Sequence, residues 1–377
     1  MSDTKYSRLL SLDVFRGITI MIMILVNSPG NRTSFAMLDH SAWNGCTLAD
    51  LVFPFFVFIV GVSSVLTLAK QRSQGMSFRY LLGKITKRTI FLFAIGLLLN
   101  GISSHVDWST LRFFGVLQRI AICYFFTSLL YLTTNIRTQA FVAVFLLVAY
   151  WLVMALVPVP GYGYPHLTMD SNLAAYIDTL FISPSHLYTK TFDPEGLLST
   201  FPAIATALLG NLMGFWLLSV NTPFKKLTGM LLVGIVMAAA GWFWGVVFPI
   251  NKALWTSSYV LWTGGLAVLI FALCYWLIEI KLWKKWSKPF EIFGVGALLV
   301  FILHVLFLKI QAMILICVSD SVTVNLRMFI THKLFPMFEL KMASLFYALS
   351  YTIFWLLIMT LIYNEKNRVK KEAYLLS

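Results

Sequence analysis

The sequence has little charge. Only 12% of its 377 residues are Asp, Glu, Lys or Arg, and 59% are hydrophobic, whereas soluble domains usually carry about 25% charged residues. The mean hydropathy is +0.82. A soluble globule of this composition would expose large apolar patches, which such proteins avoid. The composition therefore excludes a soluble globule and indicates that lipid is the solvent for most of the chain.

Cysteine and acidic residues are also scarce. The four cysteines, Cys46, Cys123, Cys274 and Cys317, have no CxxC spacing, which excludes a recognisable disulfide framework or zinc motif, and we expect no metal. Fifteen Asp and Glu against 29 Lys and Arg give a net charge of +14. A nucleic-acid-binding protein would gather such cations on a soluble face. Here they lie in short segments between apolar runs, so we expect no nucleic-acid partner.

The chain is rich in long apolar runs, each close to the roughly 20 residues that a spanning helix needs. They cover roughly 11–29, 48–69, 83–101, 112–133, 140–157, 197–219, 226–248, 256–279, 290–310 and 343–363. We therefore expect an all-α, polytopic transmembrane helical bundle of about ten spanning helices that forms a single domain over residues 1–377.

Two segments between these runs stand apart. The connection at about 158–196 is the longest and contains several Pro and Gly residues, so we expect an irregular loop that caps the outer side of the bundle. The segment 309–342 is the weakest part of the pattern. Its apolar run 312–318 is too short to span a membrane, which leaves a re-entrant or an interfacial segment as the two interpretations.

The basic residues predict the orientation of the bundle. With the N-terminus placed in the cytoplasm, most of the Lys and Arg residues fall in cytoplasmic loops, as membrane topology favours. An even number of spans then puts both termini in the cytoplasm. The first apolar run is interrupted by Asp13 and Arg16 and lacks a small-residue cleavage site, so it differs from a signal peptide.

Charged residues within apolar runs are candidates for a function, because they cost at least ~2.5–3.5 kcal/mol at bilayer depth. Asp13 and Arg16 are three residues apart and can pair on one helical face, either as a structural pair or facing a cofactor. Arg112 and Arg119 are two helical turns apart and are predicted to share a face. Arg119 needs an anion or carbonyl partner, either Asp13 or a phosphate.

A polar cluster is predicted at the outer side. Asn27 ends the first run, and His40 lies in the loop that leads to the second. Thr47 and Asp50 have the spacing of a capping box at the start of that helix. Histidine has an ordinary pKa near neutrality, so His40 is a candidate general base; the alternative is a solvated loop histidine, with Asn27 as a simple helix cap.

Two further polar segments are expected on the same side. Asp193 and Glu195 precede a predicted helix, where they either cap it or form an acidic lip that recognises an amine. Asn251 and Lys252 belong to a second polar segment, before the predicted helix at 256–279.

These segments together resemble the heparan-alpha-glucosaminide N-acetyltransferase-like family, including its bacterial members called NagX. The resemblance is carried by residues 11–17, 39–54, 115–119, 192–200 and 249–257, in that order over nearly the whole chain. It implies a membrane-bound acyltransferase, here of a bacterial cytoplasmic (inner) membrane. Such an enzyme passes an acetyl group from cytoplasmic acetyl-CoA to the amino group of a glucosamine-type sugar on the outer side.

The resemblance also implies residue roles. The active histidine of the family falls on His40 and its supporting asparagine on Asn27; we add Asp50, which would orient His40 or hold the sugar. Gln118 and Arg119 match the segment that the family is expected to place near acetyl-CoA. From their charges and positions, and not from the resemblance, we also expect Arg16, Lys84, Lys87 and Arg88 to bind acetyl-CoA. The residues expected to bind the acceptor are Asp193, Glu195, Trp43, Asn44, Asn251 and Lys252.

Several alternatives stay open at this point. The acetyl group could pass directly to the amine or through an acetyl-histidine intermediate. Besides membrane lipid and the sugar, a second copy of the chain is a candidate partner. An amino-sugar or oligosaccharide transporter is the rival function, since many helices with broken ends also suit transport, although we find no clear internal repeat.

Overall fold

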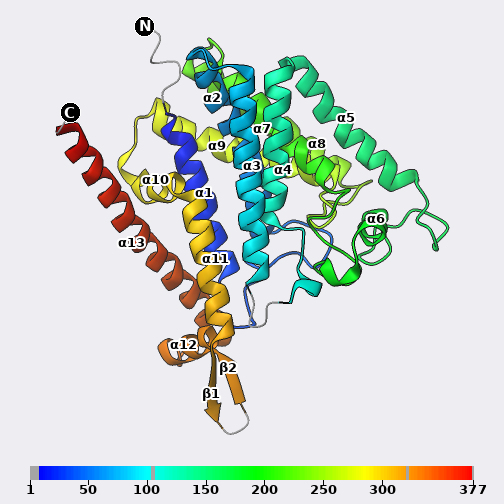
Figure 1. The fold of residues 1–377 in the computed structure, drawn as a ribbon, viewed down its shortest axis with the longest axis vertical. Helices are drawn as coiled ribbons and strands as arrows, with labels where there is room; N and C mark the ends of the chain where they lie inside the picture. The colour runs from blue at the N-terminus through cyan, green and yellow to red at the C-terminus, as the bar shows by residue number, and fades with distance from the viewer. Residues whose placement is uncertain (1–7, 103–106, 320–321, 376–377) are drawn as a thin grey trace.

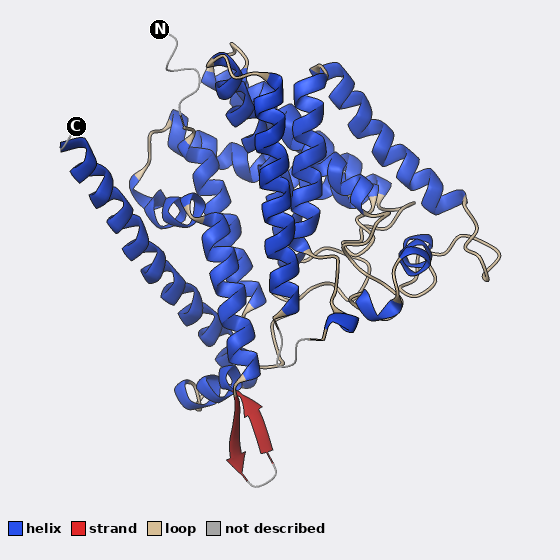
Figure 2. Ribbon diagram, viewed as in Figure 1, coloured by secondary structure: helices blue, strands red, loops and turns tan. Residues whose placement is uncertain are grey.

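The computed structural model describes residues 8–102, 107–319 and 322–375, and these fold as a bundle of helices with one small hairpin (Figures 1 and 2). The long helices are α1 (Leu10–Asn27), α2 (Leu48–Ser73), α3 (Phe78–Gly101), α4 (Val116–Thr133), α5 (Ile136–Leu156), α7 (Thr200–Leu218), α8 (Pro223–Trp244), α9 (Ser257–Tyr275), α11 (Ala297–Met313) and α13 (Leu340–Leu375). The shorter ones are α6 (Leu173–Phe181), α10 (Lys288–Val295) and α12 (Leu326–Leu334). The predicted all-α polytopic fold is confirmed.

Each of the ten predicted runs falls on a helix. In the described part of the chain, eight helices are long and apolar enough to cross a membrane, and α10 and α11, which meet at a 70° bend, give a ninth span if they are counted as one. Gly296 lies at that bend. The helix α3 is equally long, but its first three turns carry Arg79, Lys84, Lys87 and Arg88. With these charges α3 is not among the eight helices, and the span at 83–101 stays a prediction.

The segment 309–342, for which a re-entrant and an interfacial segment were the two interpretations, forms the end of α11 and a hairpin instead of a re-entrant run. Residues 312–313 complete α11, and the chain then forms the antiparallel strands β1 (Leu315–Ser319) and β2 (Val322–Asn325). The hairpin projects from the bundle (Figure 1), and Leu315 is 67% exposed. The alternation of Ile, Val and Thr favours strands, a signal that the apolar composition of the run obscures.

The bundle has two distinct ends. The helix α1 begins and α13 ends on one side, which we call the terminal end, whereas the β1–β2 hairpin marks the opposite side, the hairpin end (Figure 1). Residues 1–7 and 376–377 lie outside the described part of the chain. The first and last described helices therefore begin and end on the same side, as an even number of spans requires.

The helix α2 is fixed at its start and along its length. Thr47 and Asp50 form the predicted capping box at its N-terminus. Further along, α2 packs against α7 at Gly61 and Gly210, where a side chain has no room: a Cβ on Gly61 would lie 2.0 Å from the Ala207 carbonyl oxygen. Small residues allow membrane helices to approach this closely. The contact holds the first turn of α2, which carries Asp50, in one position.

Candidate active site

His40 and Asp50 are joined by a short hydrogen bond. Nδ1 of His40 lies 2.8 Å from Oδ1 of Asp50. The other carboxylate oxygen of Asp50 accepts from the backbone N–H groups of Ser41 and Thr47, at 3.0 and 3.1 Å. The capping box of α2 therefore also orients the histidine. An ionised carboxylate can only accept hydrogen bonds, so Asp50 favours a proton on Nδ1 of His40 and leaves Nε2 as the nitrogen that can take up a proton.

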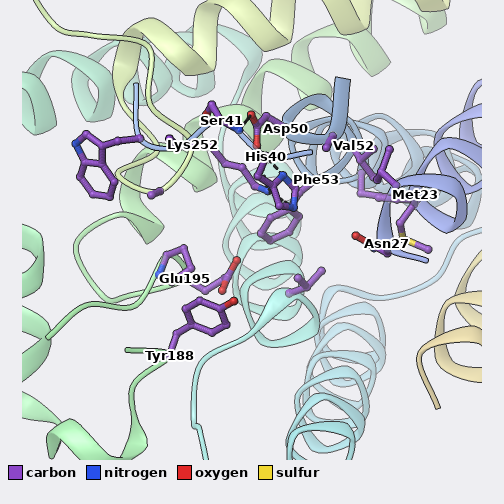
Figure 3. A pocket seen from close by; sticks show the side chains of 18 of the residues that line it. Met23, Asn27, His40, Ser41, Asp50, Val52, Phe53, Tyr188, Glu195 and Lys252 are labelled. Carbon is purple, nitrogen blue, oxygen red and sulfur yellow. Dashed lines mark hydrogen bonds and ion pairs between the residues drawn. The ribbon is translucent and has the colours of Figure 1, made fainter. Parts of the chain in front are cut away.

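His40 is accessible although Asp50 is not. The His40 side chain is 51% exposed and that of Asp50 is 1% exposed. His40 opens onto a cavity of about 400 Å³ at the hairpin end, which we call the His40 cavity (Figure 3). A buried carboxylate that holds an accessible imidazole is the arrangement that general-base catalysis uses.

Lys252 is the third member of this cluster. Its Nζ lies 3.0 Å from Nδ1 and 3.3 Å from Nε2 of His40, and 3.4 Å from Oδ1 of Asp50. Burial lowers the pKa of Lys252, and the charges of Asp50 and Glu195 oppose that shift. Sequence reasoning placed Lys252 at the acceptor site but missed its contact with His40, which is 212 residues away in the chain.

Asn27 lines the same cavity from the last turn of α1. Figure 3 places its side chain apart from His40, on the side of the cavity formed by Met23. Its predicted role as a partner of the reaction stays a prediction, and the geometry requires a substrate between the two side chains.

The acceptor-binding predictions separate into two groups. Trp43, Glu195 and Lys252 line the His40 cavity. Asn44 and Asn251 are instead bonded to each other, Nδ2 of Asn251 donating to Oδ1 of Asn44 at 3.1 Å. These two asparagines join two loops beside the cavity, and neither is among its lining residues in the described part of the chain.

Arg112 bridges the acidic pair of the long loop, and its single positive charge offsets one of the two negative charges. The guanidinium of Arg112 donates to both oxygens of Asp193, at 2.6 and 2.8 Å, and also to Glu195. Asp193 lies behind the cavity wall, whereas Glu195 lines the cavity. Tyr188, which the sequence did not single out, lies over the Arg112 guanidinium at 4.8 Å and lines the cavity as well.

The prediction that Arg112 and Arg119 share a helical face is wrong, because α4 begins only at Val116. The side chain of Asn100 donates to the carbonyl oxygens of Arg112 and Phe114, at 2.9 and 2.7 Å. These bonds hold the segment before α4 outside the helix, where Arg112 can reach the long loop.

Arg119 is 1% exposed and donates to the Gly196 carbonyl and to the Ser199 hydroxyl. The predicted partner Asp13 is therefore wrong; Asp13 is bonded to Arg8 and Arg16 instead. Neither Arg119 nor Gln118 is among the described residues that line the His40 cavity or the two cavities that adjoin it in series, which are described next. Their role in binding acetyl-CoA stays a prediction, and the contacts seen hold the long loop against α4.

Two more cavities continue from the His40 cavity toward the terminal end. The middle cavity, of about 340 Å³, shares Phe56, Val116 and Phe301 with the His40 cavity. The Arg8 cavity, of about 490 Å³, shares Arg16, Ser63 and Thr67 with the middle cavity. The three cavities therefore lie in series through the bundle.

Arg16 stands at the junction of the middle and Arg8 cavities. Its guanidinium pairs with Asp13 at 2.9 Å, as predicted, and donates to Ser63 at 2.7 Å and to the Gly294 carbonyl at 3.3 Å. It thereby connects α1, α2 and α10. Arg16 therefore lines the place where the two cavities adjoin.

Of the other predicted cofactor residues, Arg88 lines the middle cavity. Lys84 and Lys87 are exposed on α3 and are not among the described residues that line these cavities. Arg8 and Lys70, which were not singled out, line the Arg8 cavity. Among the described residues, no group of three or more His, Cys, Asp or Glu could hold a metal ion.

Comparison with known proteins agrees with the predicted resemblance. A family model described as heparan-alpha-glucosaminide N-acetyltransferase, catalytic, matches residues 8–241. The chain is 31% identical over 356 residues to heparan-alpha-glucosaminide N-acetyltransferase of Mus musculus, covering 79% of this chain and 53% of the relative. The Homo sapiens protein of that name is 31% identical over 358 residues, with 80% and 53% covered. The chain thus spans about half the length of the curated relatives it matches.

Proposed function

This chain belongs to the heparan-alpha-glucosaminide N-acetyltransferase family, and from that premise we propose that it transfers an acetyl group from acetyl-CoA to the amino group of a glucosamine-type sugar. The observation that carries the proposal is the series of three cavities that ends at the His40–Asp50 pair. It supplies a route by which a donor and an acceptor can meet from opposite ends of the bundle.

The donor enters at the terminal end, which we place in the cytoplasm from the distribution of Lys and Arg. Among the described residues, the Arg8 cavity is lined by Arg8, Arg16 and Lys70 and by one carboxylate, that of Asp13. This excess of positive charge suits the phosphates of acetyl-CoA, which arginine binds through charge-assisted hydrogen bonds. The pantetheine arm then extends through the middle cavity, and the thioester reaches His40.

The acceptor enters at the hairpin end. Glu195 supplies a carboxylate to the wall of the His40 cavity, and Trp43 and Tyr188 supply aromatic rings. This combination suits a sugar that carries an ammonium group. The names of the relatives point to a terminal glucosamine of heparan; free glucosamine or a short saccharide ending in glucosamine is the acceptor class that the cavity supports for this chain.

His40 then acts as the general base. The bound ammonium first releases one proton to solvent, and Nε2 then takes a second proton from the neutral amine as its nitrogen attacks the thioester carbon. The C–N bond forms, the C–S bond breaks, and the departing thiolate takes the proton from His40. A general base contributes about 10²- to 10⁴-fold, and holding both substrates in one cavity contributes much of the remaining acceleration. Transfer through an acetyl-histidine is the alternative sequence of steps and would be detected as acetylated protein after rapid quenching without acceptor.

The test is acetyl transfer by the purified protein in detergent. Labelled acetyl-CoA and glucosamine should give N-acetylglucosamine and free CoA in equal amounts. In proteoliposomes, uptake of unchanged glucosamine without formation of CoA would support the transporter instead and contradict the proposal.

A further inference from the structure

Lys252 places a positive charge beside the nitrogen that acts as the base. Its Nζ is 3.3 Å from Nε2 of His40, and its side chain is 20% exposed in a position that lines the His40 cavity. An ammonium group has three N–H donors. When the amine takes its place at Nε2, the N–H of Lys252 that lies against Nε2 is released and can donate to a substrate in the cavity that Lys252 lines.

The loop that carries Lys252 is held by an extensive set of hydrogen bonds. The side chain of Asn251, which is fully buried, accepts from the backbone N–H of Leu254 at 2.8 Å. The carbonyl of Lys252 itself accepts from the N–H of Trp255 at 3.1 Å, and the Ile250 carbonyl accepts from Gly45 at 2.7 Å. The last bond ties this loop to the loop that contains His40. The ammonium and the imidazole are thus fixed relative to each other before any substrate binds.

Acetyl transfer develops negative charge on the thioester oxygen. When the amine nitrogen attacks, the carbonyl π electrons move to oxygen; when they return, the C–S bond breaks. A donor that is already in place stabilises this oxyanion without reorganisation. The attacking nitrogen must lie within hydrogen-bond distance of Nε2, and the carbonyl oxygen is two bonds from that nitrogen in the tetrahedral intermediate. An ammonium 3.3 Å from Nε2 is therefore within reach of the oxygen.

We propose that Lys252 is a catalytic residue whose ammonium group donates a hydrogen bond to the thioester oxygen and stabilises the oxyanion of acetyl transfer. This role rests on the proposed function. It differs from the acceptor binding predicted from the sequence, because the interaction forms with the donor and strengthens only in the transition state.

The role requires the charged form of Lys252. Burial lowers its pKa, while Asp50, Glu195 and Cys46 act to raise it; His40 is the other titratable group in contact. Activity should therefore fall on the alkaline side as Lys252 loses its proton. An arginine at this position stays charged, so it should retain part of the activity and extend it to higher pH.

The experiment compares Lys252→Met, Lys252→Arg and the exposed control Lys190→Met from the long loop. We expect Lys252→Met to lower kcat by about 10²- to 10³-fold, the loss seen when one oxyanion donor is removed, with KM for acetyl-CoA and for glucosamine changed little. Lys252→Arg should move the alkaline limb of the kcat profile to higher pH. Lys190→Met should behave as the unaltered protein.

Two results would overturn the proposal. A raised KM for glucosamine at unchanged kcat would make Lys252 an acceptor-binding residue, and an alkaline limb that stays in place in Lys252→Arg would exclude its titration from catalysis. The arginine variant keeps the test decisive if the methionine variant does not fold. Absence of transfer in the unaltered protein would instead be a failure of the proposed function, and is seen before any variant is made.

Discussion

The His40 cavity and the Arg8 cavity differ in how their charges are balanced. Among the described residues that line the His40 cavity, Lys252 pairs with the carboxylate of Asp50, and Arg112 pairs with that of Glu195 and also with Asp193 behind the wall. Among the described residues that line the Arg8 cavity, Arg8 and Arg16 share the carboxylate of Asp13, and Lys70 is also in the wall.

This difference indicates two kinds of task. Paired charges in fixed positions suit bond making, because they need no reorganisation as charge develops. Excess positive charge suits the capture of a polyanion, because the missing counter-charge is supplied by the ligand. Variants in the His40 cavity should therefore change kcat, and variants in the Arg8 cavity should change KM for acetyl-CoA.

Replacing His40 with Ala should have the largest effect. Without the base, kcat should fall by about 10²- to 10⁴-fold, while the affinity for acetyl-CoA, measured by titration calorimetry, stays close to its original value. The exposed His332→Ala serves as the control and should retain full turnover. Normal kcat in His40→Ala would break the assignment of chemistry to this cavity.

Closing the connection between the two regions should nearly stop turnover. Val116 lines both the His40 cavity and the middle cavity, so Val116→Trp should keep the thioester from reaching His40. Val116→Ala leaves the passage open and should stay active. Val144→Trp, at a position on α5 that is 61% exposed, controls for the bulk of tryptophan. Unimpaired turnover in a folded Val116→Trp protein would mean that the donor takes another path.

Removing the Arg16 guanidinium, between the middle and Arg8 cavities, should have a smaller effect, and it should change KM more than kcat. Arg16→Ala should raise KM for acetyl-CoA about 10- to 100-fold, the equivalent of a charged hydrogen bond worth roughly 1.5–3 kcal/mol, with a lesser change in kcat. Arg16→Lys should recover part of the affinity, and Arg79→Ala, exposed at the start of α3, should have no effect. A change confined to kcat would contradict the proposed division of tasks.

The smallest expected effect is on the stability of the fold, at Asp178, which accepts a hydrogen bond from the Leu197 N–H in the long loop beside the His40 cavity. Burial raises the pKa of Asp178 in α6 to about 7 from an ordinary 3.8. Ionisation of Asp178 is therefore unfavourable in the folded protein. As pH rises from about 4 to 7, the folded state loses stability relative to the unfolded state, in which Asp178 ionises freely. Asp178→Asn keeps an oxygen for the Leu197 N–H, which now donates at 2.8 Å. The melting temperature of Asp178→Asn relative to the unaltered protein should rise between pH 5 and pH 8; a constant difference would show that Asp178 is not ionising there.

Local patterns predicted much of the fold and part of the site. Apolar runs located the long helices, and the spacing of Thr47 and Asp50 predicted a capping box because its bonds join residues three apart. The Asp13–Arg16 pair was predictable for the same reason. Strands β1 and β2 were missed, since an apolar composition does not distinguish a short strand from a membrane segment.

Contacts between distant segments could not be predicted in this way. Neither the approach of Lys252 to His40 nor the pairing of Arg112 with Asp193 has a local signal, because both depend on how loops from different helices meet. Arg119 was assigned to a cofactor or to Asp13 because a buried cation needs a partner, but sequence alone gives no indication that the partners are Gly196 and Ser199.

The proposed function makes one central claim: the donor and the acceptor reach His40 from opposite ends of the bundle. Proteoliposomes loaded with glucosamine and supplied with labelled acetyl-CoA only outside test it directly, since acetyl-CoA does not cross the lipid. We expect labelled N-acetylglucosamine inside the vesicles and free CoA outside, with both formed about 10²- to 10⁴-fold more slowly by His40→Ala. If protein that is active in detergent forms product only when both substrates are on the same side, the claim is contradicted.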